Sequence, residues 1–279
     1  MIYILVPTFG RVSETKKFLS SLENAIKTDY LVLIIDDHPD KIIYQSIREN
    51  KYIKILTPKN ELWWVGSINL GIQTLFERYT LNDSDMVIFA NNDIIINKKS
   101  FLILSAELKS NSNQIIHPRT FDHNNIEVSS GTRVLSFFPY ITTHPMEFDI
   151  YKIEIDMGTA RFLCMSVATL KKVGFINENL KQYLGDNDFT LTAKKKYNIQ
   201  TYILRDAMCV LDDTRTGIKN MNIQHIKELW KSFSSIKSPN NIYYRYQFFK
   251  KHFNPVLSGM ITVSMTINTL IKFMLRKFV

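Results

Sequence analysis

The chain has 279 residues, of which 45% are hydrophobic and 22% are charged, and its formal net charge is +9. These proportions exclude wholesale disorder and suit one large α/β domain with a small appendage. A basic charge without a matching nucleic-acid motif predicts no nucleic-acid partner. The two cysteines, Cys164 and Cys209, lie in apolar runs, which favours buried thiols and a reducing, cytoplasmic compartment over a disulfide or zinc site.

The first half of the chain alternates apolar runs with helical patterns. The N-terminal run MIYILVPTFG is interpreted as a first strand and not as a signal peptide. The predicted strands are Ile2–Val6, Tyr30–Ile35, Tyr52–Leu56 and Met86–Ala90, and the predicted helices are Glu14–Lys27, Ile42–Glu49 and Ser67–Arg78. This order predicts an α/β fold with a Rossmann-like, mostly parallel sheet flanked by helices.

The second half is less regular. Residues 118–157 are interpreted as sheet extensions or binding loops. Beyond them the pattern predicts a strand over Arg161–Val167, a helical turn over Leu170–Val173, a helix over Asp188–Tyr197 and a last strand over Thr201–Leu204. The pattern is helical from about Asn220. We therefore predict an α/β domain over residues 1–219 and a C-terminal helical extension over residues 220–279.

Polar side chains follow three of the predicted strands. Pro7–Arg11 come after the first strand, Asp36 and Asp37 after the second, and Asn91–Asp93 after the fourth. Ligands of open parallel sheets bind at the carboxyl ends of the strands, so a site is expected here. The chain has neither a GxGxxG fingerprint nor a GxxxxGK phosphate loop. A bound diphosphate would then be neutralised by a divalent cation on a carboxylate.

Six sequence blocks carry a resemblance to a known family. They are VPTFGR, IIDDHPD, ELWWVGSINLGI, VIFANND, MGTARFLCMSVATLKKVGFINENL and YLGDNDFTLTAKKKYNI. In this order and spacing, from Met1 to about Ile203, they resemble the inverting GT-A glycosyltransferases of family 2, in the rhamnosyltransferase-like branch. VPTFGR is similar to the family's VPTYNR, and VIFANND to the strand that ends in its DxD metal motif.

The resemblance implies a metal-dependent hexosyltransferase. Such an enzyme moves a sugar from a nucleoside-diphosphate sugar to a hydroxyl of a glycan or lipid-linked acceptor, here in bacterial surface polysaccharide or lipopolysaccharide synthesis. It implies Mn²⁺ or Mg²⁺ at Asp93 and a catalytic base at Asp186, with Asp188 structural. The implied donor-binding residues are Thr8, Arg11, Asp37, Asn69, Asn91 and Asn92.

Departures from the family pattern keep other interpretations open. The DxD motif is NND here, Gly185 replaces the acidic residue before the base, and Asp212 and Asp213 stand where many relatives have a histidine. Whether either aspartate adds a metal ligand stays open. An alternative function is therefore a catalytically silent subunit that binds nucleotide sugar or glycan. A nucleotidyltransferase is disfavoured, because a glycine-rich basic loop near the first strand is missing.

Some candidate residues also have purely structural interpretations. The aspartates at 36 and 37 and the segment 91–93 would serve as turns, and those at 186 and 188 as helix-capping residues. Trp63 and Trp64 would be plain core residues. These interpretations stay open from the sequence alone.

The C-terminal stretch Pro255–Ile271 has no charged residue and is flanked by basic ones. It is too short and too polar for a comfortable membrane span. An apolar stripe recurs at helical spacing: Val256, Met260, Val263, Ile267, Leu270, Ile271 and Met274. Two interpretations stay open: a helix packed on its own domain or on a second copy in a homodimer, or an interfacial helix on the inner face of an anionic cytoplasmic membrane. The second predicts peripheral attachment at most.

Overall fold

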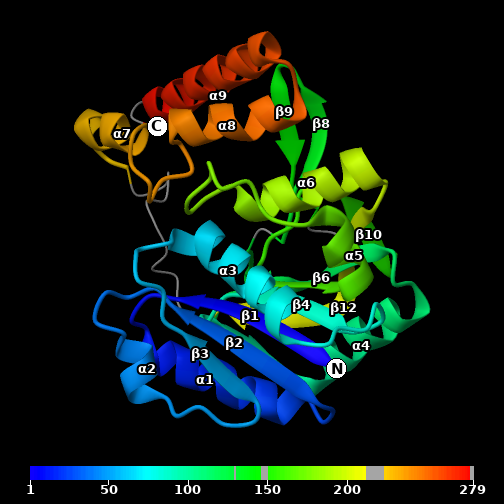
Figure 1. The fold of residues 1–279 in the computed structure, drawn as a ribbon. Coiled ribbons are helices and arrows are strands. Elements are labelled where there is room, and N and C mark those ends of the chain that lie inside the picture. The colour runs from blue at the N-terminus through cyan, green and yellow to red at the C-terminus, as the bar shows by residue number, and fades with distance from the viewer. Residues whose placement is uncertain (129, 146–149, 212–222, 277–279) are drawn as a thin grey trace.

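The computed structural model describes residues 1–128, 130–145, 150–211 and 223–276 (Figure 1). Its main sheet has the strand order β10-β12-β6-β11-β4-β1-β2-β3, with β5 paired to β12 and β7 to β6. Six strands on this path run in one direction, and β10 and β11 run in the other. The predicted mostly parallel sheet is thus confirmed. The strands are β1 (Ile2–Thr8), β2 (Tyr30–Asp36), β3 (Ile53–Leu56), β4 (Met86–Ala90), β5 (Ile94–Ile96), β6 (Gln114–Phe121), β7 (Glu127–Val128), β10 (Lys152–Ile155), β11 (Phe162–Ser166) and β12 (Gln200–Leu211).

Helices cover both faces of this sheet (Figure 1). Alternate residues of β1 point to opposite layers: Ile4 joins the core under α1 (Val12–Ala25), α2 (Ile42–Ser46) and α4 (Lys98–Ser110). Leu5 joins the core under α3 (Trp63–Arg78), α5 (Val167–Val173) and α6 (Gly185–Tyr197). Burial on both faces explains why the parallel strands are continuous apolar runs.

The structure contains elements that the sequence interpretation missed. Helix α4 and strand β5 follow β4 directly. The last strand, β12, continues seven residues past its predicted end, through a register shift between Leu204 and Met208. Its far end pairs Leu211 with Ile94, beside the acidic end of β4. The irregular segment over residues 118–157 includes a separate hairpin of β8 (Arg133–Phe137) and β9 (Tyr140–Thr143).

Over the described residues 223–276, the C-terminal extension contains three helices: α7 (Ile226–Ser232), α8 (Ile242–His252) and α9 (Pro255–Leu275). Tyr244, Phe248 and Phe249 of α8 and Ile261 of α9 belong to the same buried core as α3 and α6. The extension is therefore packed onto the α/β sheet as part of one core. The predicted boundary at 219/220 lies outside the described residues and stays a prediction.

Helix α9 packs on its own chain with a face that mixes polar and apolar residues. Its buried residues are Ser258, Ile261, Thr262 and Phe273, which span most of its length. Most of the predicted apolar stripe instead faces outward, with Val256 74%, Val263 58% and Ile267 50% exposed, while Leu270 is partly buried. Helix α9 therefore packs on its own domain, as one interpretation expected, but mainly through residues outside the stripe, and contact of the outward residues with a second copy or a membrane surface stays a prediction.

By length and composition alone, the 21-residue helix α9 is apolar enough to cross a membrane, since an 18-residue window within it has a mean hydropathy of 1.4. From the sequence, the stretch Pro255–Ile271 was judged too short and too polar to span a membrane. The helix is longer than that stretch, because it continues to Leu275. Its buried residues, from Ser258 to Phe273, and the hydrogen bond from Arg245 of α8 to Thr269 favour a helix lying on the protein over one that leaves it.

Candidate active site

A cleft of about 300 Å³ lies at the carboxyl ends of β1, β2 and β4, against the first turn of α3. The sequence placed polar residues at these three strand ends, and the structure brings them together. The cleft is lined by Pro7, Thr8, Phe9, Arg11, Asp37, Glu61, Trp63, Trp64, Ser67, Asn91, Asn92, Asp93, Gln182, Tyr183 and Lys237.

Asp37 fixes the loop that leads into α3. Its Oδ1 accepts the backbone N–H of Leu62 and its Oδ2 that of Trp63, both at 2.7 Å. Trp63 has a φ of 60°, a left-handed conformation that is uncommon for a large side chain. Burial raises the pKa of the Asp37 carboxyl, and the two backbone hydrogen bonds oppose that rise. A backbone strained in this way beside a cleft is typical of functional sites.

Two further polar residues at the ends of β1 and β2, Thr8 and Asp36, make hydrogen bonds within the protein. Asp36 is fully buried, and its two oxygens accept the backbone N–H groups of His38 and Tyr44. Its bonding therefore serves the turn and α2, which accords with the choice of Asp37 as the donor-binding aspartate. The Thr8 hydroxyl donates to the carbonyl of Ile35 at 3.1 Å, and Thr8 still lines the cleft.

The loop after β4 is braced against α1. Arg11 Nη1 lies 3.2 Å from Asp93 Oδ2, and Asp93 is 3% exposed. Asn92 donates its side-chain amide to Thr15 Oγ1 at 2.9 Å. The Thr15 hydroxyl in turn donates to the Arg11 carbonyl. Arg11 and Asp93 thus form an ion pair in the cleft wall, and the Asn92 amide is used for bracing.

Asn91 orients a tryptophan ring, because its Oδ1 accepts the Trp64 indole N–H at 3.2 Å. That ring packs against Gly185, where an added Cβ would lie 2.6 Å from Val65 Cγ2 and 3.0 Å from Trp64 Cζ3. The space next to Gly185 is therefore filled by Trp64 and Val65. The preceding residue, Leu184, has a φ of 68°, again in the left-handed region.

Asp186 begins α6 beside this contact. Its Oδ2 accepts the backbone N–H of Ala160 at 3.1 Å and its Oδ1 that of Asn187 at 2.9 Å. Burial raises the pKa of its carboxyl above the ordinary value, while these hydrogen bonds and the charge of Arg161 oppose the rise. A raised pKa suits a general base, although the helix N-terminus works against it. Asp186 is not among the residues that line the cleft, although Trp64, which lines it, packs against the preceding residue, Gly185.

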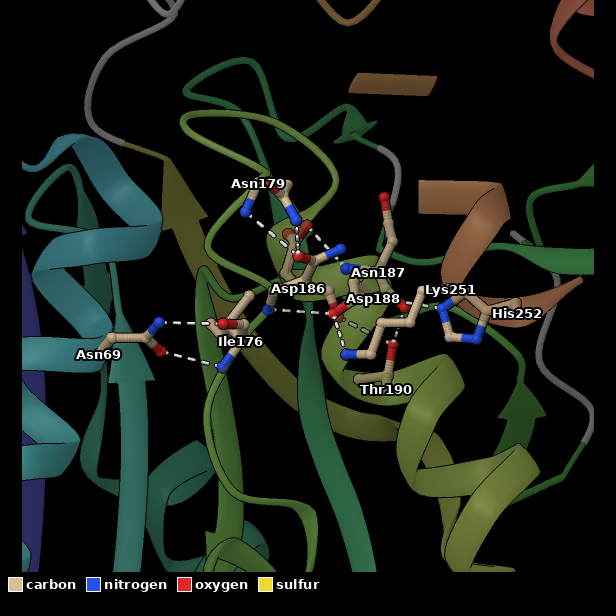
Figure 2. Close-up of polar contacts among 10 residues, drawn as sticks. Asn69, Ile176, Asn179, Asp186, Asn187, Asp188, Thr190, Lys251 and His252 are labelled. Carbon is tan, nitrogen blue, oxygen red and sulfur yellow. Dashed lines mark hydrogen bonds and ion pairs between the residues drawn. The ribbon is translucent and has the colours of Figure 1, made fainter. Parts of the chain in front are cut away.

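Asn69 is placed differently from the prediction. Its amide donates to the carbonyl of Ile176 and accepts the backbone N–H of the same residue, both at 2.9 Å (Figure 2). It is buried in α3 and is not among the lining residues. Its place in the donor pocket is therefore corrected: both halves of the amide are used to hold a chain segment 107 residues away.

Asp188 is fully buried and ties α6 to α8 (Figure 2). Its carboxylate lies 2.7 Å from Lys251 Nζ and 3.0 Å from His252 Nε2, and it also accepts the backbone N–H of Asn177. These contacts account for the predicted structural role of Asp188.

Replacing Asp188 with Ala is expected to lower the free energy of unfolding by about 3–5 kcal/mol, because it leaves the half-buried Lys251 without its counter-charge and the buried His252 ring without its hydrogen-bond partner. Urea denaturation measures this loss. Asp83→Ala is the matched control, since Asp83 pairs with Lys171 on the surface and should cost under about 1 kcal/mol. Equal costs for the two variants would contradict a structural role for the buried carboxylate.

The residues around Asp93 could hold a divalent cation only if ligands from outside the protein complete its coordination. Among the described residues there is no group of three His, Cys, Asp or Glu side chains that could hold a metal. Mg²⁺ and Mn²⁺ nevertheless bind through one carboxylate when substrate phosphates and water supply the remaining oxygens. Asp93 fits that arrangement, so a metal here would bind together with the donor. Asp212 and Asp213 lie outside the described residues.

Several lining residues were not predicted. Trp63 and Trp64 were considered as core residues, and the structure places both half-exposed in the cleft. Lys237 comes from the loop between α7 and α8, and its Nζ lies 6.0 Å from the centre of a Trp63 ring. Its position depends on how the C-terminal helices pack, and no local sequence signal marks it.

Asp37→Ala is expected to weaken nucleotide binding by about 1–3 kcal/mol, the usual cost of a lost hydrogen bond to a charged group. It should also loosen the loop before α3, since two backbone N–H groups lose their acceptor. Calorimetry with nucleoside diphosphates measures the affinity. Asp40→Ala, in the same turn but exposed, is the control, and unchanged affinity of Asp37→Ala in a folded protein would contradict the assignment.

Comparisons with known proteins support the fold. No protein-family model and no curated protein sequence matches the chain. The fold is similar to GalNAc-T7 with UDP, GalNAc and Mn²⁺, at a TM-score of 0.59 and 9% identity over 95% of this chain and 54% of that one. It is also similar to residues 1–349 of TarS from S. aureus, at a TM-score of 0.55 and 14% sequence identity. This match covers 98% of this chain and 72% of the TarS chain.

It is also similar to the mannosyltransferase PcManGT from Pyrobaculum calidifontis in complex with GDP-Man and Mn²⁺, at a TM-score of 0.55 and 7% identity over 95% and 68%. The chain therefore spans about half the length of GalNAc-T7 and a larger share of the other two. At these identities the likeness concerns the fold, and the fold is that of GT-A glycosyltransferases.

Proposed function

We propose that this protein is an inverting glycosyltransferase of the family 2 type, in its rhamnosyltransferase-like branch. It moves a sugar from a nucleoside-diphosphate donor to a hydroxyl of a glycan or lipid-linked acceptor, in bacterial surface polysaccharide synthesis in the cytoplasm. The observation that carries the proposal is the cleft that gathers Arg11, Asp37 and Asp93 from three strand ends of a GT-A sheet.

Each side of the cleft suits one part of the donor. The nucleoside lies by Thr8 and Asp37, which close the β1 and β2 ends. The diphosphate lies by Arg11 and Lys237, the two cations in the lining, because positive side chains stabilise phosphate oxygens. A divalent metal held by Asp93, when bound, supplies further charge stabilisation of the leaving diphosphate.

The acceptor enters the cleft beside Trp64, which packs against Gly185, the residue before Asp186 at the start of α6. The acceptor oxygen forms a bond to the anomeric carbon while the bond from that carbon to the phosphate oxygen breaks. Asp186 takes the hydroxyl proton, and the nucleoside diphosphate leaves with the electron pair of the broken bond. One displacement inverts the anomeric centre, so no second carboxylate acts as a nucleophile.

A silent subunit that binds nucleotide sugar or glycan is the second candidate. The observation that favours it is the loss of carboxylates: Asn91 hydrogen-bonds a tryptophan, and Gly185 is packed against Trp64 and Val65. Such a protein would keep the donor cleft and lack turnover.

Thermal unfolding across a panel of nucleoside diphosphates with Mn²⁺ tests the donor site. A ligand that binds only the native state at 100 times its dissociation constant stabilises it by about 2.7 kcal/mol. We expect one base to be preferred, and the matching nucleotide sugars to be slowly hydrolysed. Binding without hydrolysis or transfer would favour the silent subunit, and no binding of any nucleotide would contradict both candidates.

A further inference from the structure

A second cavity, of about 350 Å³, is lined by residues of β9, α7, α8 and α9 and shares no lining residue with the catalytic cleft. Three of its lining residues are cations: Arg245, Lys272 and Arg276. None of the described residues that line it is an Asp or a Glu. Asn268 and Thr269 add polar groups beside these cations, while Met265 and Phe273 add apolar surface. The lining of the cavity is therefore positively charged and partly apolar.

Arg245 is the unusual member of this set, because it is 5% exposed. Its guanidinium donates to the carbonyl of Pro239 at 3.1 Å, to Asn240 Oδ1 at 2.7 Å and to Thr269 Oγ1 at 3.4 Å. All of these acceptors are uncharged, and within the described part of the chain no carboxylate forms an ion pair with Arg245. Burial lowers its pKa to about 10. A buried charge without a counter-ion is costly, and an anion from outside the chain would offset that cost.

The surface next to this cavity is apolar. The outward stripe of α9, defined by Val256, Met260, Val263, Ile267, Ile271 and Met274, is between 44% and 74% exposed. Its C-terminal end carries two of the cavity's cations, Lys272 and Arg276. An exposed apolar stripe of this length marks an interaction site. An apolar helix face with basic residues at its end is typical of helices that lie in the interface of an anionic membrane.

We propose that this cavity binds the phosphate group of an anionic lipid, on a membrane surface against which the outward stripe of α9 rests. The cations hold the phosphate oxygens by charge-assisted hydrogen bonds, since guanidinium and ammonium groups are the usual phosphate ligands. Met265 and Phe273 contact the first carbons of the lipid chain. The site is separate from the catalytic cleft, and it does not depend on which sugar is transferred.

The test compares charge reversals inside and outside the cavity. Lys272→Glu with Arg276→Glu changes the cavity, and Lys231→Glu with Lys250→Glu makes the same change in net charge at exposed positions of α7 and α8. Arg245 is left intact, because it also holds the loop 234–240 that carries Lys237 into the catalytic cleft. Unchanged binding of nucleoside diphosphate shows that each variant is folded.

Co-sedimentation of the full chain with vesicles gives the readout. We expect binding to phosphatidylcholine vesicles that contain phosphatidylglycerol and none to pure phosphatidylcholine. The cavity variant should bind roughly tenfold or more weakly than wild type, and the exposed control should stay near wild type. An equal loss in both variants would mean general electrostatic attraction and would overturn the proposal.

Two further outcomes would also overturn it. Inorganic pyrophosphate could raise the unfolding temperature through Lys272 and Arg276 while no vesicle binds, which would indicate a soluble phosphate ligand. Alternatively, sedimentation could show a dimer that Ile267→Asp dissociates, again without vesicle binding, which would make the outward stripe a contact between two copies. Loss of vesicle binding in Ile267→Asp, with the chain monomeric throughout, supports the lipid site.

Discussion

An Asp186→Asn variant is expected to turn over roughly 10²–10⁴-fold more slowly than wild type, the usual contribution of a general base. The amide keeps the shape of the side chain and one acceptor for the backbone N–H groups of Ala160 and Asn187, but it cannot take the acceptor proton. Initial rates at saturating donor measure the change. Nucleotide affinity should stay near normal, because Asp186 does not line the donor cleft.

The pH profile separates this role from a structural one. The base works in its ionised form, and burial raises the pKa of the Asp186 carboxyl. Turnover of the wild type should therefore fall on the acid side at a pH above the ordinary carboxyl range, and this limb should vanish in Asp186→Asn. If Asp186→Asn keeps most of its activity as a folded protein, Asp186 is not the base and the assignment is wrong.

Removal of divalent metal is expected to stop turnover, and Mn²⁺ or Mg²⁺ should restore it. Asp93→Asn should lower the rate by roughly 10²–10³-fold, which corresponds to the several kcal/mol that a metal contributes to charge stabilisation. Activity with and without EDTA measures the first effect. Asp40→Asn is the control, because Asp40 is an exposed carboxylate on a neighbouring loop.

The Arg11–Asp93 ion pair further predicts that metal affinity depends on bound nucleotide. A cation beside the carboxylate disfavours a second cation, so Mn²⁺ should bind weakly to the protein alone and more tightly with a nucleoside diphosphate. Titration of Mn²⁺ with and without UDP or GDP measures the difference. Full turnover in EDTA would contradict a metal role and leave Arg11 and Lys237 as the groups that stabilise the diphosphate.

The parallel half of the sheet could be predicted because both faces of its strands are buried. Such strands are unbroken apolar runs, and β1, β2 and β4 were predicted to within two residues. Helix α4 carries a weaker but visible signal, with Phe101, Leu104 and Leu108 at helical spacing. The end of β12 was missed because Arg205 and Asp206 interrupt its apolar pattern, where the strand changes register on β6.

The site was predictable where it depends on strand ends and unpredictable where it depends on packing. Asp37 and Asp93 follow strands and reach the cleft for that reason. The role of Asn69 was missed because an amide in a helix is equally able to face a ligand or a backbone, and here Ile176 supplies both partners. Lys237 lies beyond the resemblance to known glycosyltransferases, and only the fold of the C-terminal helices brings it to Trp63.

The tight contact at Gly185 constrains the order in which this sequence could change. A side chain at 185 would press on Val65, a fully buried residue whose branched side chain has little rotamer freedom. An ancestor or engineered variant with an acidic residue at 185 therefore requires a smaller residue at 65 and a displaced Trp64 beforehand. Because Trp64 is also bonded to Asn91, the NND sequence and the glycine form a linked set. Libraries that vary 64, 65, 91 and 185 together should recover folded acidic variants that single substitutions at 185 do not.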